Sequence, residues 1–187
     1  RERAMGDSQA RRASIMSIRR MARPSLLRAL VKLLVLRRDR TEPRPLSEEQ
    51  NGARRLQCQA PGLRVRAEGE PIALTVDRTK LGTAIANLLS NAIRFSAAGG
   101  VITLAVSGTP EAVHIDVCDA GPGIAVNDRD RIFEPFFRGE RQPEHTVKGT
   151  GIGLSIVQEY IAAHGGRIAL LPDGPGARFR IELPRTT

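Results

Sequence analysis

Late in the chain the sequence reads Lys148-Gly149-Thr150-Gly151-Ile152-Gly153-Leu154, with three glycines at alternate positions directly before a run of helical pattern. Backbone N–H groups that glycine leaves accessible add to the dipole of a helix N-terminus, and together they form an anion site. The glycine spacing differs from the Walker loop and from the dinucleotide-binding loop. The segment also does not follow the first strand, as a Rossmann loop would. It therefore predicts a phosphate site of another architecture.

A long helix is predicted upstream, from a cap at Asp77 to about Phe95. Asn87 and Asn91 share one face of it, one turn apart. Since asparagine is a poor helix former, this pair is either part of an exposed polar face or a ligand site. In the second case the amide oxygens meet a hydrated Mg²⁺ and phosphates, because Mg²⁺ takes oxygen ligands and keeps several waters. Arg94, almost one turn further, could reach a phosphate.

The segment Asp119-Ala-Gly-Pro-Gly-Ile124 directly follows a predicted strand. Taken alone, it is either an ordinary turn or part of a binding site. An aspartate at a strand end can accept a hydrogen bond from an exocyclic amine such as that of adenine. Gly121 and Gly123 would let the backbone approach a flat ring.

The stretch from 120 to 149 is long, mostly polar and contains glycines. A loop of this length inside a compact domain is usually functional. Within it, Arg131-Ile-Phe-Glu-Pro-Phe-Phe-Arg-Gly139 holds three of the five phenylalanines of the protein. These phenylalanines predict a hydrophobic anchor for one end of the loop, and Arg138 could sense a terminal phosphate.

The order of predicted elements indicates an α/β fold. Alternating apolar patterns predict strands over 63–66, 72–76, 101–107, 113–118, 167–171 and 177–183, and helical patterns predict helices over 47–59, 77–95 and 153–164. Helices separated by strand pairs favour a two-layer α/β sandwich. We expect a mixed sheet of about five strands with three helices on one face.

The N-terminal residues 1–44 are interpreted as a basic, partly helical arm that precedes a domain over 45–187. Residues 1–66 hold 17 Lys and Arg against 6 Asp and Glu. Apolar positions predict a helix over 25–38, and the prolines of 41–45 predict a linker. Such an arm can be solvated, or can meet nucleic acid, a membrane surface or an acidic partner. It lacks base-stacking aromatics, which disfavours a nucleic-acid partner, above all a single strand.

The cysteines and the hydropathy pattern point to the cytoplasm. Cys58 and Cys118 have no metal-type spacing, so both are interpreted as reduced thiols. No apolar run reaches the length of about 18 residues that a transmembrane helix needs, and no signal peptide is visible. We therefore expect a cytoplasmic protein, or the cytoplasmic part of a membrane-bound sensor, without a transmembrane segment in this sequence.

In this order and spacing, the motifs resemble those of the ATPase domain of sensor histidine kinases, in the wider family with gyrase, the Hsp90 chaperone and MutL. The resemblance covers about residues 45–185 and includes Ala163-His-Gly-Gly166 after the last helix. The four matching boxes are Asn87-Leu-Leu-Ser-Asn-Ala-Ile-Arg-Phe-Ser96 (N box), Asp119-Ala-Gly-Pro-Gly-Ile124 (G1 box), Phe133-Glu-Pro-Phe-Phe137 (F box) and Gly149-Thr-Gly-Ile-Gly-Leu154 (G2 box).

The resemblance implies a role for each motif. Asn91 would bind Mg²⁺ with Asn87 beside it, and these two with Arg94 would form the catalytic group. The residues that would contact adenine are Phe95, Asp119, Gly121, Gly123 and Ile124. Those that would surround the phosphates of ATP are Arg138, Lys148, Gly149, Thr150, Gly151, Gly153 and Leu154. Residues from about 125 to 148 would form a mobile ATP lid, and phosphoryl transfer would rest on positioning and on charge neutralisation by Mg²⁺.

The acceptor histidine of a sensor kinase is not evident in this sequence. His114 falls on a predicted strand, His145 in the presumed lid and His164 at the end of the last helix. Residues 25–38 are then either a remnant of a dimerisation helix or an unrelated arm. Three interpretations stay open: a kinase core whose acceptor lies elsewhere, a degenerate kinase that binds ATP and regulates a partner, and an anti-sigma-type serine kinase. The first implies a response regulator or acceptor-histidine domain as partner, and a homodimer in the full-length protein.

Overall fold

The computed structural model describes residues 34–37, 56–57, 63–140, 149–172 and 174–185. Its main sheet has six strands in the order β2-β3-β5-β6-β8-β7. Only β3 and β5 pair in parallel, and all other neighbours are antiparallel, so the sheet is mixed as predicted. The strands of this sheet are β2 (Leu56–Gln57), β3 (Arg64–Gly69), β5 (Val101–Gly108), β6 (Ala112–Cys118), β7 (Arg167–Leu171) and β8 (Arg178–Pro184). Since β2 has two residues, five full strands form the sheet.

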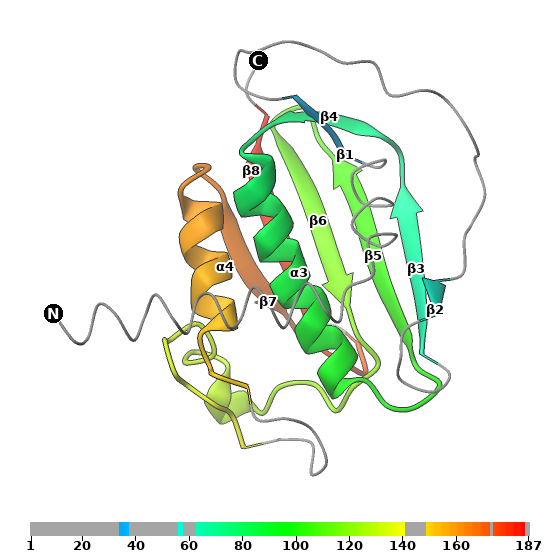
Figure 1. Cartoon of the computed structure of the whole chain (residues 1–187), viewed down its shortest axis with the longest axis vertical. Coiled ribbons are helices and arrows are strands. Elements are labelled where there is room, and N and C mark those ends of the chain that lie inside the picture. The colour runs from blue at the N-terminus through cyan, green and yellow to red at the C-terminus, as the bar shows by residue number, and fades with distance from the viewer. Residues whose placement is uncertain (1–33, 38–55, 58–62, 141–148, 173, 186–187) are drawn as a thin grey trace, which may run out of the picture.

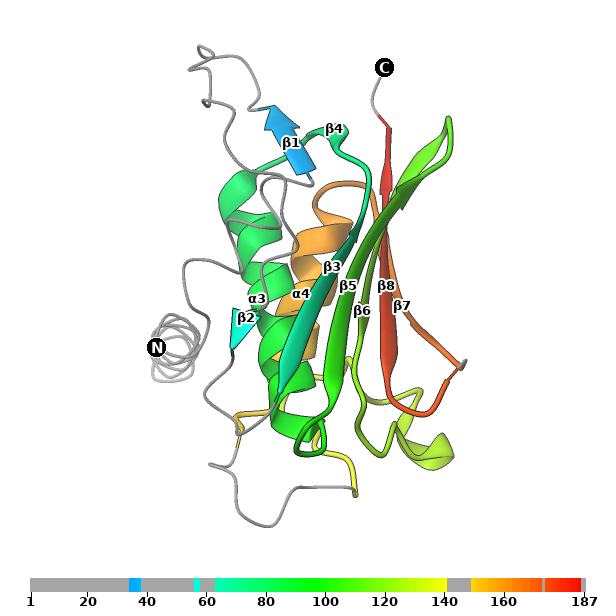
Figure 2. The same ribbon diagram turned by 90° about the vertical axis from the view of Figure 1, so that its right-hand side faces the viewer.

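Two helices, α3 (Arg78–Phe95) and α4 (Gly153–Ala162), lie side by side on one face of this sheet (Figures 1 and 2). Asp77 caps α3, and its Oδ1 accepts the N–H groups of Thr79 at 2.8 Å and Lys80 at 3.1 Å. This cap satisfies donors that a helix start leaves unpaired. The predicted start and end of α3 are confirmed, and so is the predicted second layer.

The core lies between the helices and the sheet. Alternate residues of the central strands face the helices, because successive side chains of a strand point to opposite faces. The buried set includes Ile102, Leu104 and Val106 of β5, Val113, Ile115 and Val117 of β6, Phe179, Ile181 and Leu183 of β8, and Leu81, Ile85, Leu88, Leu89 and Ala92 of α3. The five α3 residues recur at helical spacing and so form one apolar face of the helix.

Two predicted helices are wrong where the structure describes them. Within the helix predicted over 25–38, Leu34–Arg37 forms strand β1, which pairs in parallel with β4 (Ile72–Thr75) outside the main sheet. Within the helix predicted over 47–59, Leu56–Gln57 forms β2, which pairs with β3. The remaining residues of both predicted helices lie outside the described part of the chain. A short apolar run is compatible with a helix or a strand. In both segments, pairing with a neighbouring strand makes the run a strand.

The sheet face opposite the helices carries an ion cluster. Asp116 of β6 is 5% exposed, and Arg180 donates to its Oδ1 and Oδ2 at 2.7 Å each. Arg178 donates to Oδ2 at 2.8 Å. Burial by itself would raise the pKa of Asp116, but the hydrogen bonds from Arg180 and Arg178 outweigh it and hold the pKa below its usual value. The cluster therefore ties β6 to β8 while Asp116 is ionised.

We expect Asp116→Asn to lower the free energy of unfolding at neutral pH by about 1–2 kcal/mol, because it leaves two arginines without their carboxylate. The cost stays moderate because the Arg178 and Arg180 side chains are 31% exposed. A depressed folded pKa contributes stability above the unfolded value of about 3.9, and this contribution is lost as the pH falls through the folded pKa. The gap between variant and wild type should therefore narrow below about pH 4 in urea unfolding. A difference in the free energy of unfolding that is equal at neutral and acidic pH would contradict the role of ionised Asp116. The matched control is Glu182→Gln, which removes the more exposed ion pair with Arg167.

Candidate functional site

The C-terminal end of α3 meets the loop that follows β6. Gly121 lies so close to the end of the helix that a Cβ there would come within 2.5 Å of the Phe95 carbonyl oxygen. The structure thus brings Phe95 and the Asp119–Ile124 segment together, as predicted. Gly123 has a φ of +68°, a conformation that glycine adopts without strain, and Ile124 is half-buried against the core.

Asp119 is held by two backbone donors. Its Oδ1 accepts the N–H of Gly121 at 2.9 Å and the N–H of Ala177 at 3.0 Å. Burial raises the pKa of the Asp119 carboxyl, and the two N–H donors only partly offset that effect. Both hydrogen bonds go to the same oxygen, which leaves Oδ2 without a partner among the described residues. A half-buried carboxylate held in this way presents one fixed acceptor to a ligand.

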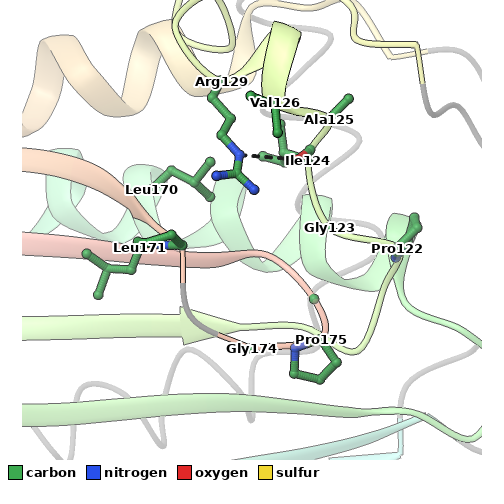
Figure 3. Close-up of a pocket in the computed structure, with 12 residues that line it drawn as sticks. Pro122, Gly123, Ile124, Ala125, Val126, Arg129, Leu170, Leu171, Gly174 and Pro175 are labelled. Atoms are coloured by element: carbon green, nitrogen blue, oxygen red, sulfur yellow. Dashed lines mark hydrogen bonds between the residues drawn. The ribbon is translucent and has the colours of Figure 1, made fainter.

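The sequence did not reveal the support that the residues directly before β8 give to Asp119. The turn before β8 and the loop after Asp119 line one pocket (Figure 3). Gly176 approaches so closely that a Cβ on it would overlap the Asp119 main chain. The Asp119 N–H in turn donates to the Ala177 carbonyl at 3.0 Å. From the sequence, the segment 172–176 is only the connection between the strands predicted over 167–171 and 177–183. The contact spans 58 positions of sequence, so local patterns carry no signal for it.

A second group of predicted residues meets at the start of α4. The Arg94 guanidinium lies against Gly149, where a Cβ would overlap Nη1. Burial, and then the positive charge of Arg138, lower the pKa of Arg94. Two like-charged guanidinium groups close enough to influence each other suit an anion between them. Arg94 and Gly149 are therefore in contact although 55 positions separate them in the sequence, and Arg138 contributes positive charge to the same region.

Asn87 lies beside the first residue of α4. A Cβ on Gly153 would be 3.5 Å from Asn87 Oδ1, so the two helices approach closely here. Asn87 is 4% exposed, and its Nδ2 has no hydrogen-bond partner among the described residues. A buried N–H donor without a hydrogen bond lowers the stability of the fold. The Asn87 amide can therefore donate to an acceptor atom of a ligand. Asn91, one turn along α3, is half-buried.

The F-box segment is joined to the glycine-rich segment. The Phe136 N–H donates to the Gly151 carbonyl at 3.0 Å, with Phe136 at φ +66° and Gly151 at φ +74°. A non-glycine residue at positive φ is strained and persists only where its surroundings hold it. Phe133 and Phe137 pack against the core, whereas Phe136 is 67% exposed. The predicted hydrophobic anchor is therefore confirmed for two of the three phenylalanines.

The described part of the presumed lid has internal order. It begins with the 3-10 turn η1 (Val126–Asp128). Buried Asp128 accepts the Glu140 N–H at 2.9 Å through Oδ2, and Gly139 packs against the same carboxylate. Asp128 was not predicted as a structural residue. Its hydrogen bond with Glu140 joins the two ends of the segment 128–140, which contains the F box.

The remaining predicted residues are distributed as follows. Thr150 is exposed and Leu154 is half-buried against the core. Lys148 and His145 lie outside the described residues. His164 has a structural role, because its Nε2 accepts the Asp77 N–H at 3.0 Å and its Nδ1 contacts the Tyr160 carbonyl at 2.6 Å. His114 lies 3.4 Å from Glu182 on β8. His164 therefore serves the fold, and His114 of β6 lies opposite Glu182 of β8 in the sheet.

Comparisons with known proteins agree with this arrangement. The family model described as histidine kinase-, DNA gyrase B-, and HSP90-like ATPase matches residues 76–187. Sensor-like histidine kinase SenX3 of Mycobacterium tuberculosis is 40% identical over 109 residues, which are 58% of this chain and 27% of SenX3. The solved structure of mycobacterial sensor histidine kinase MprB has a TM-score of 0.61 at 30% identity, covering 66% of this chain and 84% of that one. Full-length ShkA in complex with AMPPNP has a TM-score of 0.56 at 32% identity, covering 67% of this chain and 26% of that one.

The chain spans about a quarter of the length of the first curated relatives it matches. Over the part of the chain that the structure covers, no helix is long and apolar enough to cross a membrane.

Proposed function

Because the chain belongs to the family of histidine kinase-, DNA gyrase B- and HSP90-like ATPases, we propose that it is the ATP-binding catalytic part of a two-component sensor histidine kinase. Its substrate is ATP, and the γ-phosphate goes to a histidine of an acceptor domain. The names of the relatives, which are sensor histidine kinases, support this branch of the family over an anti-sigma-type serine kinase.

One observation carries the proposal. Arg94 and Asn87, both on α3, contact Gly149 and Gly153 at the N-terminus of α4. A helix N-terminus, a glycine-rich backbone and a guanidinium group in one place form an anion site. The buried, unpaired Nδ2 of Asn87 adds a donor. This combination suits the triphosphate of a nucleotide whose base reaches Asp119 at the C-terminal end of the same helix.

The residues present also suit Mg²⁺. Among the described residues, no group of three or more His, Cys, Asp and Glu side chains could hold a metal ion. The ion would therefore depend on Asn91, with Asn87 beside it, and on phosphate oxygens and water, the ligands that Mg²⁺ accepts. When bound, Mg²⁺ supplies charge neutralisation at the phosphates. Arg94 and Arg138 hold and orient the same phosphates, and residues 125–148 close over them.

The proposal includes the partners of such a kinase. The acceptor histidine belongs to a dimerising helical domain, so the full-length protein is a homodimer and passes its phosphate to a response regulator. A degenerate kinase that binds ATP and regulates a partner is the second candidate, because His164 Nε2 accepts the Asp77 N–H and His114 lies on strand β6 beside Glu182.

The test is phosphorylation with ATP labelled at the γ-phosphate and Mg²⁺, with this chain alone and with a purified acceptor-histidine domain. We expect acid-labile label on the acceptor domain and none on this chain. Label on this chain alone would contradict our assignment of the acceptor to another segment. Acid-stable label would favour a serine kinase, and nucleotide binding without any label would favour the degenerate kinase.

A further inference from the structure

His164 joins the C-terminal end of α4 to the N-terminal end of α3. Its Nδ1 lies 2.6 Å from the Tyr160 carbonyl oxygen, and its Nε2 lies 3.0 Å from the Asp77 main-chain nitrogen. A carbonyl oxygen only accepts, so Nδ1 carries the proton, and Nε2 then offers the lone pair that the Asp77 N–H requires. The neutral ring with its proton on Nδ1 is the one form that satisfies both contacts.

The Asp77 N–H is thus accepted from another helix. Asp77 is the N-cap of α3, and in a capping box the third helical residue, a Glu or Gln, accepts the N–H of the N-cap. In α3 the third residue is Lys80, whose side chain has donors only. His164 therefore supplies, from 87 positions away, the acceptor that the start of α3 lacks.

The turn after α4 holds His164 in place. The Gly165 N–H donates to the Ala162 carbonyl at 2.9 Å, and the Gly166 N–H donates to the Ile161 carbonyl at 3.1 Å. Gly165 has a φ of +68°, so the chain leaves the helix through the left-handed conformation that glycine favours. Because the backbone on both sides of the histidine is fixed, the position of its ring is tied to the position of α4.

The two helices run antiparallel, so the His164 contact and the anion site lie at opposite ends of the pair (Figure 1). At the far end, Arg94 and Asn87 of α3 are the neighbours of Gly149 and Gly153. Helix α4 has ten residues, which is a length of about 15 Å. A rigid helix that is displaced along its axis at one end is displaced equally at the other. Apolar packing holds the axial position less strictly than a hydrogen bond does, because only the hydrogen bond is directional.

We propose that His164 is a positioning residue for the binding of the ATP phosphates. Its hydrogen bond with Asp77 sets the axial position of α4 against α3, and so sets the distance from the start of α4 to Asn87 and Arg94. The effect falls on the phosphates, because the start of α4 faces them, and not on adenine, which meets Asp119 in another loop. The role at the phosphates rests on the proposed function, whereas the hydrogen bonds of His164 do not.

The hydrogen bonds are tested first, without nucleotide. In the wild-type chain, nitrogen NMR of the imidazole should show a proton on Nδ1 of His164 and none on Nε2. His164→Asn has a side chain too short to reach Asp77, and we expect its backbone amide signals to shift at 149–156 as well as at 77. His164→Gln places a side-chain oxygen near the position of Nε2, so these signals should return toward their wild-type positions.

A proton on Nε2 in the wild type would overturn the proposal, and so would unshifted signals at 149–156 in His164→Asn. Because the proton position is measured on the wild type, it decides even where a variant fails to fold.

Nucleotide binding then measures the consequence. We expect His164→Asn to bind a fluorescent ATP analogue about threefold to tenfold more weakly than the wild type, the equivalent of about one hydrogen bond. It should bind adenosine normally in competition experiments, and His164→Gln should recover most of the affinity for ATP. Val113→Ala is the matched control, because it removes buried methyl groups at the same end of the molecule, where Val113 pairs with Leu183 and the Leu183 side chain lies against Gly166. It should lower stability and leave the affinity for ATP unchanged.

Equal losses of affinity for ATP and adenosine in His164→Asn, or the same loss in Val113→Ala, would make His164 a residue of general stability and overturn the proposal. Wild-type affinity for ATP in His164→Asn would overturn it as well. If the wild type itself bound no ATP, the proposed function would be wrong, and the amide signals at 149–156 would still decide whether His164 positions α4.

Discussion

We expect Asp119→Asn to lower the affinity for ATP at least about a hundredfold and to leave the fold intact. Asparagine keeps a side-chain oxygen that can accept the N–H groups of Gly121 and Ala177, which now hold Asp119 at 2.9 and 3.0 Å. Its second group is an NH₂ donor where the carboxylate has an acceptor. The adenine amine is also a donor, so the two groups repel each other. A site built to hydrogen-bond a group of its substrate loses much of its affinity when that buried hydrogen bond cannot form.

The measurement is equilibrium binding of a fluorescent ATP analogue, with circular dichroism and urea unfolding to verify the fold. Asp130→Asn is the matched control, since Asp130 is an exposed carboxylate of the same loop region. It should bind like the wild type. Wild-type affinity in Asp119→Asn would remove Asp119 from the adenine site, and a loss of folding would show that the carboxylate acts on structure alone.

Gly151→Ala separates the F-box segment from the glycine-rich segment. Gly151 has a φ of +74°, and a Cβ there would come within 2.7–2.8 Å of the Phe136 backbone. The hydrogen bond from the Phe136 N–H to the Gly151 carbonyl at 3.0 Å cannot survive this displacement. We expect a loss of about 1–3 kcal/mol in stability from strain and overpacking. Nucleotide affinity should fall at least about tenfold, because the anion site is no longer preorganised.

The control for Gly151→Ala is Gly82→Ala in α3, where an added Cβ meets nothing within 4 Å. Alanine is the better helix former, so this variant should gain up to about 1 kcal/mol in thermal or urea unfolding and bind ATP normally. Gly151→Ala with wild-type stability and wild-type affinity would contradict the joined arrangement of the two segments.

The sequence was sufficient for elements whose pattern is long and capped. Asp77 caps α3, and five apolar residues at helical spacing form its buried face, so both the helix and its orientation were predictable. The strands β5 to β8 alternate clearly and were also predicted. By contrast, Leu34–Arg37 and Leu56–Gln57 are short, and only their pairing with β4 and β3 makes them strands. Pairing across distant sequence is a tertiary effect that local propensity does not contain.

In the candidate site, too, local sequence patterns indicate some residues, whereas others depend on contacts between distant parts of the chain. Residues in motifs, such as Asn87, Asp119 and Gly151, were predictable because their chemistry is tied to a short local spacing. The residues that position them were not. Gly176 and Ala177 hold Asp119 from the turn that precedes β8, and Asp128 holds the Glu140 N–H from 12 positions away. Gly176 and Ala177 act through their backbone and Asp128 through its carboxylate, and each meets a partner that no local sequence pattern indicates.

The central claim is that α3, the Asp119–Ile124 loop and the N-terminus of α4 form one site for ATP and Mg²⁺. The most direct measurement is titration of the chain with a fluorescent ATP analogue in the presence and absence of Mg²⁺, for the wild type, Asn91→Ala and Asp119→Ala. We expect saturable binding to one site that Mg²⁺ strengthens, and loss of binding in both variants. Unchanged affinity in both variants would contradict the account.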